Sequence, residues 1–205
     1  ERSQMFSVET NELFLDFSKN LIDRAIWADL IALAKNSPLQ EMKSSMFSGK
    51  KINASENRAV LHTLLRKNNG SGVGKLDRLL KKVKDQKKQI KKVSDRIRSG
   101  SWLGVGGKPI TDVVNIGIGG SDLGPRLACH ALIEFSHPTI NIHFIGNVDG
   151  ADLLSTLSKL DPQRTLIIIA SKTFKTLETL MNGNTAMKWL QTHLNLRDPQ
   201  RTDHL

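Results

Sequence analysis

Residues 113–125 read VVNIGIGGSDLGP, and this stretch decides the fold. Its first half is an apolar, β-branched run, which is typical of a strand buried in a parallel sheet. Gly117, Gly119 and Gly120 then allow the backbone to turn sharply and to approach a ligand closely. The serine and aspartate that follow are good helix N-cap residues, so the stretch also predicts a helix that begins at Leu123.

A strand, a glycine turn and a helix N-terminus together make an anion-binding site. The unpaired backbone N–H groups of the first helical turn and the positive end of the helix dipole point at one spot. The phosphate of a sugar phosphate or of a nucleotide is therefore the expected ligand of this turn.

The pattern recurs further along the chain. Residues 165–170 (TLIIIA) form another apolar run of strand length, and residues 171–176 (SKTFKT) follow it directly. Three hydroxyls, two lysines and exposed N–H groups at a helix start can hold a phosphate. The alternative is that Ser171, Thr173 and Thr176 only cap the helix. Two such turns favour binding, because ligands of open α/β sheets lie at the carboxyl ends of the strands.

A dinucleotide site is the other interpretation of the glycine turn. It needs a GxGxxG motif, but residues 117–122 read GIGGSD and lack the last glycine. It also needs an acidic residue at the end of the next strand, whereas the strand expected near residues 140–145 ends in Gly146 and Asn147. The sequence therefore argues against NAD binding.

At this point the motifs match a known family. The stretch at 113–125 resembles the signature of the glucose-6-phosphate isomerase (phosphoglucose isomerase) family, and residues 170–179 (ASKTFKTLET) resemble its second phosphate loop. Further stretches agree in the same order: LFLDFSKNLID at 13–23, INASENRAVLHTLLR at 52–66, RSGSWLGVGGKPITD at 98–112 and NVDG at 147–150.

This resemblance implies a fold. We expect an α/β protein whose parallel sheet is flanked by helices, as a flavodoxin-like three-layer sandwich of the sugar-phosphate-binding (SIS) type. Residues 1–110 are expected to be a mostly helical N-terminal region, and residues 111–205 part of the sugar-phosphate-binding domain. Because the family's enzymes are more than twice this length, the chain is expected to be an N-terminal fragment.

The resemblance also implies an activity, the interconversion of glucose 6-phosphate and fructose 6-phosphate in glycolysis and gluconeogenesis. A carboxylate base passes a proton between C1 and C2 through an enediol(ate), without cofactor or metal. The family's base lies in a MESNGK-like segment and its active-site lysine in a DQxGVExxK-like segment, and neither occurs in the 205 residues. The fragment alone is thus expected to carry no catalytic residue and to be inactive. The alternative is a non-catalytic phosphosugar-binding module.

The site residues are carried over by motif. Glu178 is either a carboxylate beside the site or an exposed residue of the helix. Lys175 and Leu177 depart from the family's usual threonine and glutamine; the lysine adds charge beside the loop. The residues expected to bind substrate are Gly119, Gly120 and Ser121, and those expected to hold its phosphate are Ser171, Lys172, Thr173 and Thr176.

Composition sets further bounds. The chain has 205 residues, 39% of them apolar, which suffices for a core. A single cysteine, Cys129, excludes an internal disulfide and fits a reducing, cytoplasmic compartment. No apolar run approaches the roughly 20 residues that span a membrane, and the six histidines lack metal-ligand spacing. We therefore expect no membrane and no metal, and by resemblance a homodimer of the full-length protein.

The formal net charge of +10 has a local source. Residues 75–98 hold eleven lysines and arginines against three aspartates, with apolar residues at helical spacing. This segment predicts an amphipathic helix with a solvated basic face. A nucleic-acid or membrane-surface helix is the alternative, but the segment has no aromatic side chain to stack on bases, so we expect no nucleic-acid partner.

The remaining elements follow from periodicity. Residues 11–35 predict one or two amphipathic helices, and residues 55–58 can cap a helix over 59–67. From residue 111 onward strands and helices alternate, which predicts a parallel sheet. The strands are expected near 112–118, 140–146 and 165–170, and the helices near 122–135, 150–160 and 176–194.

Overall fold

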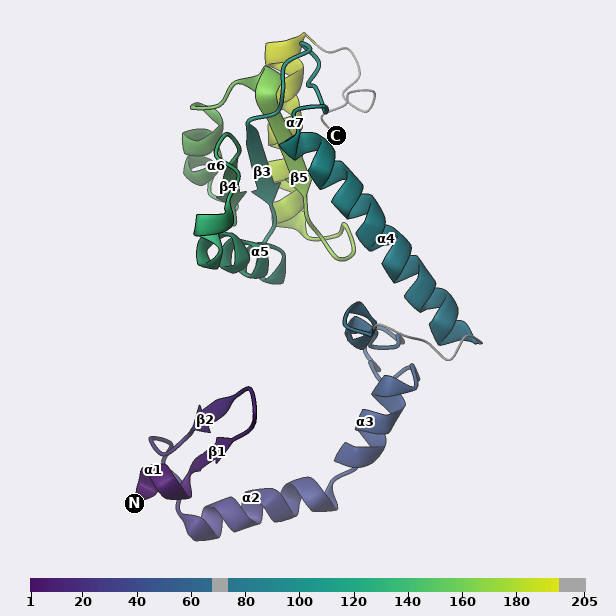
Figure 1. Cartoon of the computed structure of the whole chain (residues 1–205), viewed down its shortest axis with the longest axis vertical. Helices are drawn as coiled ribbons and strands as arrows, with labels where there is room; N and C mark the ends of the chain where they lie inside the picture. The colour runs from purple at the N-terminus through teal and green to yellow at the C-terminus, as the bar shows by residue number, and fades with distance from the viewer. Residues whose placement is uncertain (68–73, 196–205) are drawn as a thin grey trace. The chain divides into compact units, whose positions relative to one another are not determined.

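The computed structural model describes residues 1–67 and 74–195 (Figure 1). The chain divides into two compact units, Glu1–Asp85 and Gln86–Leu205. The domain boundary predicted after residue 110 stays a prediction, and residues 196–205 of the predicted second domain lie outside the described residues.

A three-stranded parallel sheet is the centre of the second unit. Its strands are β3 (Asp112–Ile116), β4 (Asn141–Ile145) and β5 (Thr165–Ile169), in the order β4-β3-β5. Ile116 pairs with the last residue of β4 and with the last residue of β5. All three strands therefore end at the same level, and the predicted alternation of strand and helix is confirmed.

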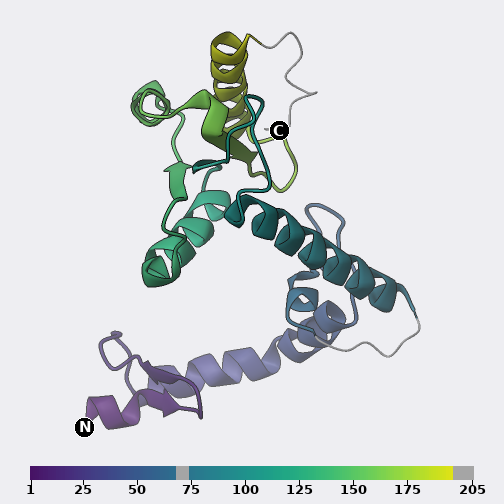
Figure 2. The same cartoon turned by 45° about the horizontal axis from the view of Figure 1, so that its top comes forward.

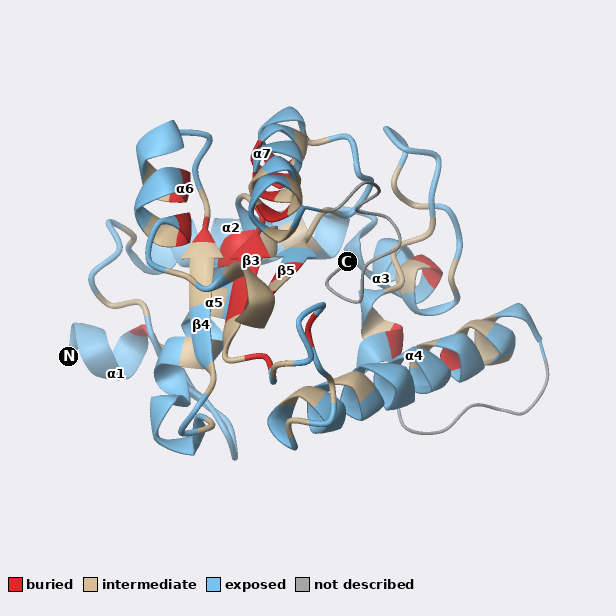
Figure 3. Cartoon of the chain, turned by 90° about the horizontal axis from the view of Figure 1, so that it is seen from above, coloured by how far each residue is buried: buried red, intermediate tan, exposed pale blue. Residues whose placement is uncertain are grey.

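Helices cover both faces of this sheet. The helices are α5 (Gly120–Ala131), α6 (Gly150–Leu157) and α7 (Leu177–Leu194), with short 3₁₀ turns η2 (Ile133–Phe135) and η3 (Pro162–Arg164). Helices α6 and α7 lie on one side of the sheet and α5 on the other (Figure 3). The α/β fold with a parallel sheet between helices is thus confirmed.

The core lies between the sheet and the pair α6 and α7. Alternate residues of a strand point to opposite faces, so Val114 and Ile116 face this core while Asn115 faces α5. Burial of branched apolar side chains from three strands and two helices supplies the main stabilising term. The cluster consists of Val114, Ile116, Ile145, Leu153, Leu157, Ile167, Ala186 and Leu190.

The first unit is built from shorter pieces. They are α1 (Arg2–Met5), β1 (Ser7–Glu9), β2 (Phe14–Asp16), α2 (Arg24–Asn36), α3 (Leu39–Phe47), η1 (His62–Leu65) and the first half of α4 (Lys75–Arg98). Strands β1 and β2 pair antiparallel. Helix α4 is one continuous helix over the predicted range (Figure 2), which confirms that prediction.

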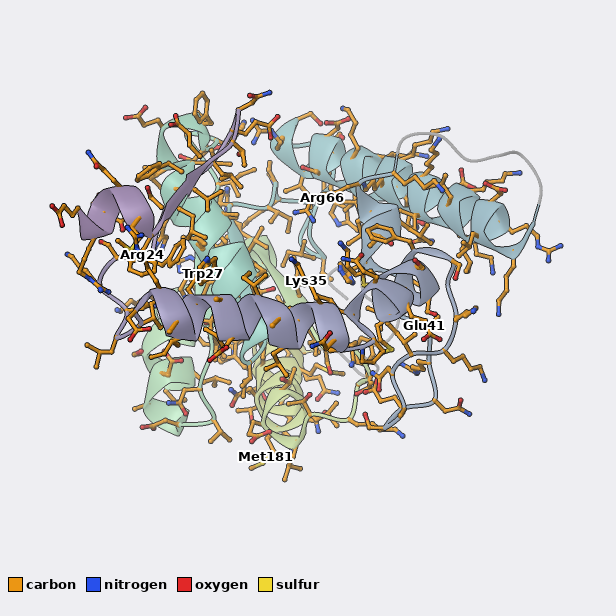
Figure 4. All side chains as sticks on the ribbon, turned by 90° about the horizontal axis from the view of Figure 1, so that it is seen from below. Arg24, Trp27, Lys35, Glu41, Arg66 and Met181 are labelled. Carbon is orange, nitrogen blue, oxygen red and sulfur yellow. The ribbon has the colours of Figure 1, made fainter. Side chains whose placement is uncertain are left out.

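The helix predicted over 11–35 is wrong in its first half. Residues 14–16 form β2, and α2 begins only after Asp23, whose Oδ1 accepts a hydrogen bond from the backbone N–H of Ile26 at 2.8 Å. The reason is tertiary. Phe17 lies between the rings of Phe6 and Trp27, with centroid distances of 5.9 and 4.8 Å, and holds the hairpin against the start of α2. Trp27 and Arg24 project from this end of α2 (Figure 4).

The helix predicted over 59–67 is also wrong, because only η1 forms there. Asn53 and Arg58 exchange two backbone hydrogen bonds, each of 3.1 Å, and close a tight turn. Asn57 takes a left-handed conformation (φ 50°) inside this turn. The turn therefore uses the residues that the sequence suggested as a helix cap.

Candidate functional site

The two predicted anion loops lie next to each other. One follows β3 and the other follows β5, and these strands are neighbours that end in register. The ladder continues into both loops, because Ala170 N–H donates to Ile116 O at 2.8 Å and Gly117 N–H donates to Ile145 O at 3.2 Å. In the order β4-β3-β5 the chain runs from β3 outward to β4 and then across to β5. The topological switch point therefore lies between the carboxyl ends of β3 and β5, and open α/β sheets bind ligands at this point.

The glycine loop is tighter than the sequence suggested. Gly119 has φ +58°, and a Cβ on Gly117 would lie 2.7 Å from the backbone oxygen of Ser121. Glycine allows the positive φ at position 119 and the close approach at position 117, because it has no Cβ. Helix α5 therefore begins already at Gly120, with Gly119 as its N-cap residue. The prediction that Ser121 and Asp122 cap a helix starting at Leu123 is therefore wrong, since both residues lie inside the helix.

Asp122 has a structural partner instead. It is 6% exposed, and Arg126 one turn later donates to it from Nη2 at 2.9 Å and from Nε at 3.1 Å. The same guanidinium lies 5.0 Å from the ring centroid of Phe144 in β4. A Cβ on Gly146 would lie 2.7 Å from Asp122 Oδ2. These contacts join the first turns of α5 to the end of β4.

The second loop is organised by its own hydroxyls. Ser171 Oγ accepts a hydrogen bond from the backbone N–H of Phe174 at 3.1 Å and lies 3.3 Å from Thr176 Oγ1. Phe174 takes a left-handed conformation (φ 52°). Thr176 occupies the N-cap position of α7 without a side-chain capping hydrogen bond. Its hydroxyl therefore does not cap the helix. The exposed members of the loop are Lys172, Thr173, Phe174 and Lys175.

Glu178 lies in the first turn of α7 and is exposed. Its two alternative roles, beside the site or on the helix surface, both stay predictions. In the described part of the chain no group of three or more histidine, cysteine, aspartate or glutamate residues is arranged to hold a metal ion.

Sequence reasoning missed the polar residues beneath the two loops. Asn182 of α7 is 5% exposed and donates from Nδ2 to the backbone oxygen of Asn147, in the loop after β4, at 2.6 Å. Thr179 of α7 is 1% exposed. Asn115 of β3 donates to the backbone oxygen of Ser121 at 3.1 Å. Polar residues at positions 179 and 182, on the helix face that packs on the sheet, are the signal that could have revealed them.

A hollow elsewhere on the second unit does not compete with this site. It lies on the C-terminal half of α4 and is lined by Lys88, Lys91, Lys92, Asp95, Arg96 and Ser99. These side chains are long and solvated, and Lys91 is paired with Asp95 at 2.6 Å. The hollow belongs to an exposed charged surface, whereas the two loops gather helix N-termini at one edge of a sheet.

The site can attract an anion. Helices α5 and α7 begin at the same edge, so the positive ends of both helix dipoles are directed toward it. Lys172 and Lys175 add positive charge in the second loop. The fold and this edge thus define an open α/β protein whose switch point can attract an anion.

The comparisons with known proteins agree with that class. The phosphoglucose isomerase family model matches residues 16–205. A "Glucose-6-phosphate isomerase 1" of Chromobacterium violaceum is 47% identical over 194 residues, which is 94% of this chain and 35% of the relative. A glucose-6-phosphate isomerase of Helicobacter pylori is 47% identical over 191 residues, 92% of this chain and 35% of the relative.

A solved structure gives the same result for the fold. A glucose-6-phosphate isomerase from Chlamydia trachomatis matches with a TM-score of 0.73 at 24% identity, over 93% of this chain and 37% of that one. The chain belongs to the phosphoglucose isomerase family. It spans about a third of the length of the curated relatives it matches. Within residues 1–67 and 74–195, no helix is both long and apolar enough to cross a membrane.

Proposed function

We propose that this chain supplies the phosphosugar-binding part of a glucose-6-phosphate isomerase. Gly119, Gly120 and Ser121 line the substrate, and backbone N–H groups of the glycine loop make most of the polar contact. The phosphate lies in the second loop, held by Ser171, Lys172, Thr173 and Thr176. The substrate is glucose 6-phosphate or fructose 6-phosphate, whose dianionic phosphate suits two helix N-termini.

The observation that carries this proposal is the register of β3 with β5. It brings the glycine loop and the hydroxyl loop to one level at the switch point of the sheet. Family membership supports the identity of the substrate, because curated relatives at 47% identity are glucose-6-phosphate isomerases.

The 205-residue chain by itself is proposed to have no isomerase turnover. Aldose–ketose interconversion needs a base of suitable pKa beside C1 and C2, and the segment expected to carry it does not occur in the sequence. We further propose that the whole protein works in the cytoplasm as a homodimer, without a cofactor and without a nucleic-acid partner.

Titration calorimetry tests the binding site. The chain should bind glucose 6-phosphate, and Ser171→Ala and Thr173→Ala should each weaken the affinity about three- to tenfold, because each removes one hydrogen bond to the phosphate. Thr192→Val is the matched control, since Thr192 lies near the far end of α7 and donates to Lys188 O. If neither loop substitution changes the affinity, this loop does not hold the phosphate.

A coupled assay tests the second part. Purified chain, freed of host enzyme, should show no conversion of fructose 6-phosphate to glucose 6-phosphate. Turnover that follows the chain through purification would show that a base lies within these 205 residues.

A further inference from the structure

Thr179 carries a buried hydroxyl that has no hydrogen-bond partner among the described residues. The residue is 1% exposed, and Oγ1 accepts and donates nothing there. A buried hydroxyl without a partner has lost its hydrogen bonds to water and gained none in return. Such groups are rare in native proteins, and each one requires an explanation, such as an ordered water, a bound ion or a functional role.

The position of Thr179 follows from the packing of α7. This helix begins at the carboxyl edge of the sheet and runs back to contact η3, which precedes β5. Gly183 packs on the last residue of β5, since a Cβ there would lie 3.0 Å from Ile169 Cδ1. Thr179 lies about one helical turn before Gly183 on the same face. It therefore lies just past the end of the sheet.

The direction of the side chain completes this picture. The Cα–Cβ bonds of a helix tilt toward its N-terminus. The Thr179 side chain is thus directed from the buried face of α7 toward the loop at residues 171–176, on the side of the sheet edge. The hydroxyl is therefore directed toward the proposed phosphate site.

A second buried polar residue on the same face of α7, Asn182, does have a hydrogen-bond partner. Asn182 is buried as deeply, and its Nδ2 is bonded to Asn147 O at 2.6 Å. Ser171 Oγ and Thr176 Oγ1 lie 3.3 Å apart, within hydrogen-bond distance. The buried amide of Asn182 thus has a partner in the protein, whereas Thr179 Oγ1 has none among the described residues.

We propose that Thr179 is a ligand-positioning residue whose hydroxyl hydrogen-bonds the bound phosphosugar, directly or through one ordered water. This inference rests on the proposed function and adds one residue to it. The hydroxyl donates to a phosphate or sugar oxygen, and its methyl group stays packed in the core. The hydrogen bond to the ligand offsets the cost of burying the hydroxyl without a protein partner.

Two substitutions separate a ligand role from a packing role. Thr179→Val keeps the shape and removes the hydroxyl, and Thr179→Ser keeps the hydroxyl. We expect Thr179→Val to weaken glucose 6-phosphate binding about tenfold in calorimetry while raising the melting temperature of the ligand-free chain. Thr179→Ser should bind within about twofold of the parent chain.

Thr185→Val is the matched control. Thr185 lies on the same helix, is exposed, and donates to Met181 O at 3.0 Å. It should change neither the affinity nor, by more than a degree or so, the melting temperature. Inorganic phosphate is titrated in parallel. An equal loss for phosphate and for the sugar phosphate assigns the hydroxyl to the phosphate, and a loss for the sugar phosphate alone assigns it to the sugar.

Three results would overturn the inference. They are an unchanged affinity in Thr179→Val, a lower melting temperature in Thr179→Val, and failure of Thr179→Val to fold, because the last two mean that the hydroxyl serves the fold. Ser171→Ala separates this inference from the proposed function. If Ser171→Ala weakens binding and Thr179→Val does not, only the inference fails; if the parent chain binds no phosphosugar, the proposed function fails first.

Discussion

The two units of the chain use their apolar side chains differently. In Gln86–Leu205, strands and helices bury a single cluster of eight residues. In the described part of Glu1–Asp85 the buried apolar residues are Phe6, Leu64 and Leu80, and α2 has no buried residue. Large apolar side chains are exposed in both units, and in the first unit Leu21 is 99% exposed. The exposed ones include Leu13, Phe14, Leu15, Leu21 and Leu33.

This difference shows what a local pattern can specify. A run of strand, helix and strand closes a core from consecutive segments, so periodicity and structure agree. Where the apolar side of an amphipathic segment has no partner within its own unit, other contacts determine its secondary structure. Periodicity alone then does not predict it. The second unit should therefore behave as the stable part of the chain, and the first unit should respond weakly to loss of its apolar side chains.

The largest expected effect is a core truncation. Leu190→Ala removes a side chain that is 1% exposed in the cluster of α7, and should lower the free energy of unfolding by about 2–5 kcal/mol. Leu21→Ala, at 99% exposure, should change it by less than about 0.5 kcal/mol. Urea unfolding followed by circular dichroism measures both. Equal losses of unfolding free energy in the two variants would contradict this difference between the units.

A medium effect is expected at the glycine loop. In Gly117→Ala the new Cβ would meet the backbone oxygen of Ser121 at 2.7 Å, so the start of α5 must shift. The substitution should cost about 1–3 kcal/mol and weaken phosphosugar binding. Gly150→Ala is the control, because nothing lies within 4 Å of its Cβ and it begins α6. Urea unfolding and calorimetry that show no difference between the two variants would disprove the close approach.

The smallest effect concerns Asp16 in the first unit. The backbone N–H of Ser18 donates to Asp16 Oδ1 at 2.8 Å and, with the Ser18 side chain and Lys19, holds the pKa of this carboxyl below its ordinary value. The charged form is favoured in the folded chain. Its contribution is therefore present above the ordinary pKa and is lost as the pH falls through the lowered one. The group is exposed, so the effect on stability is small.

A carbon-detected NMR titration of Asp16 measures this shift. The midpoint should lie below the ordinary aspartate value of 3.8, which serves as the reference. An Asp16 midpoint at or above the reference would mean that the turn after β2 does not form in solution.

Much of the second unit could be predicted from the sequence. The strands at 112–116, 141–145 and 165–169 and the basic helix were predicted because their apolar periodicity coincides with burial. The start of α5 was missed, because a glycine with positive φ can replace a side-chain cap. The first unit was predicted poorly, because β2 depends on pairing with β1 and on the stacking of Phe17, contacts that no local pattern encodes.

The candidate site divides in the same way. The loops at 117–121 and 171–176 stand out in the sequence because glycines and hydroxyls follow apolar strands. Their nearness depends on the strand order β4-β3-β5, which only the three-dimensional structure shows. Thr179 and Asn182 were not predicted from the sequence. The burial of Thr179 and the hydrogen bond of Asn182 to Asn147 arise only when α7 packs on the sheet.

An NMR titration of the ¹⁵N-labelled chain with glucose 6-phosphate tests the central claim most directly, which is that the ligand binds between the ends of β3 and β5. If the ligand binds there, the backbone amides at 117–121 and 171–179 should show saturable shifts, and the amides of α2 should not shift. Inorganic sulfate at equal ionic strength controls for general charge effects. Shifts confined to the amides of α4, or absent from both loops at saturating ligand, would show that the ligand does not bind between the ends of β3 and β5.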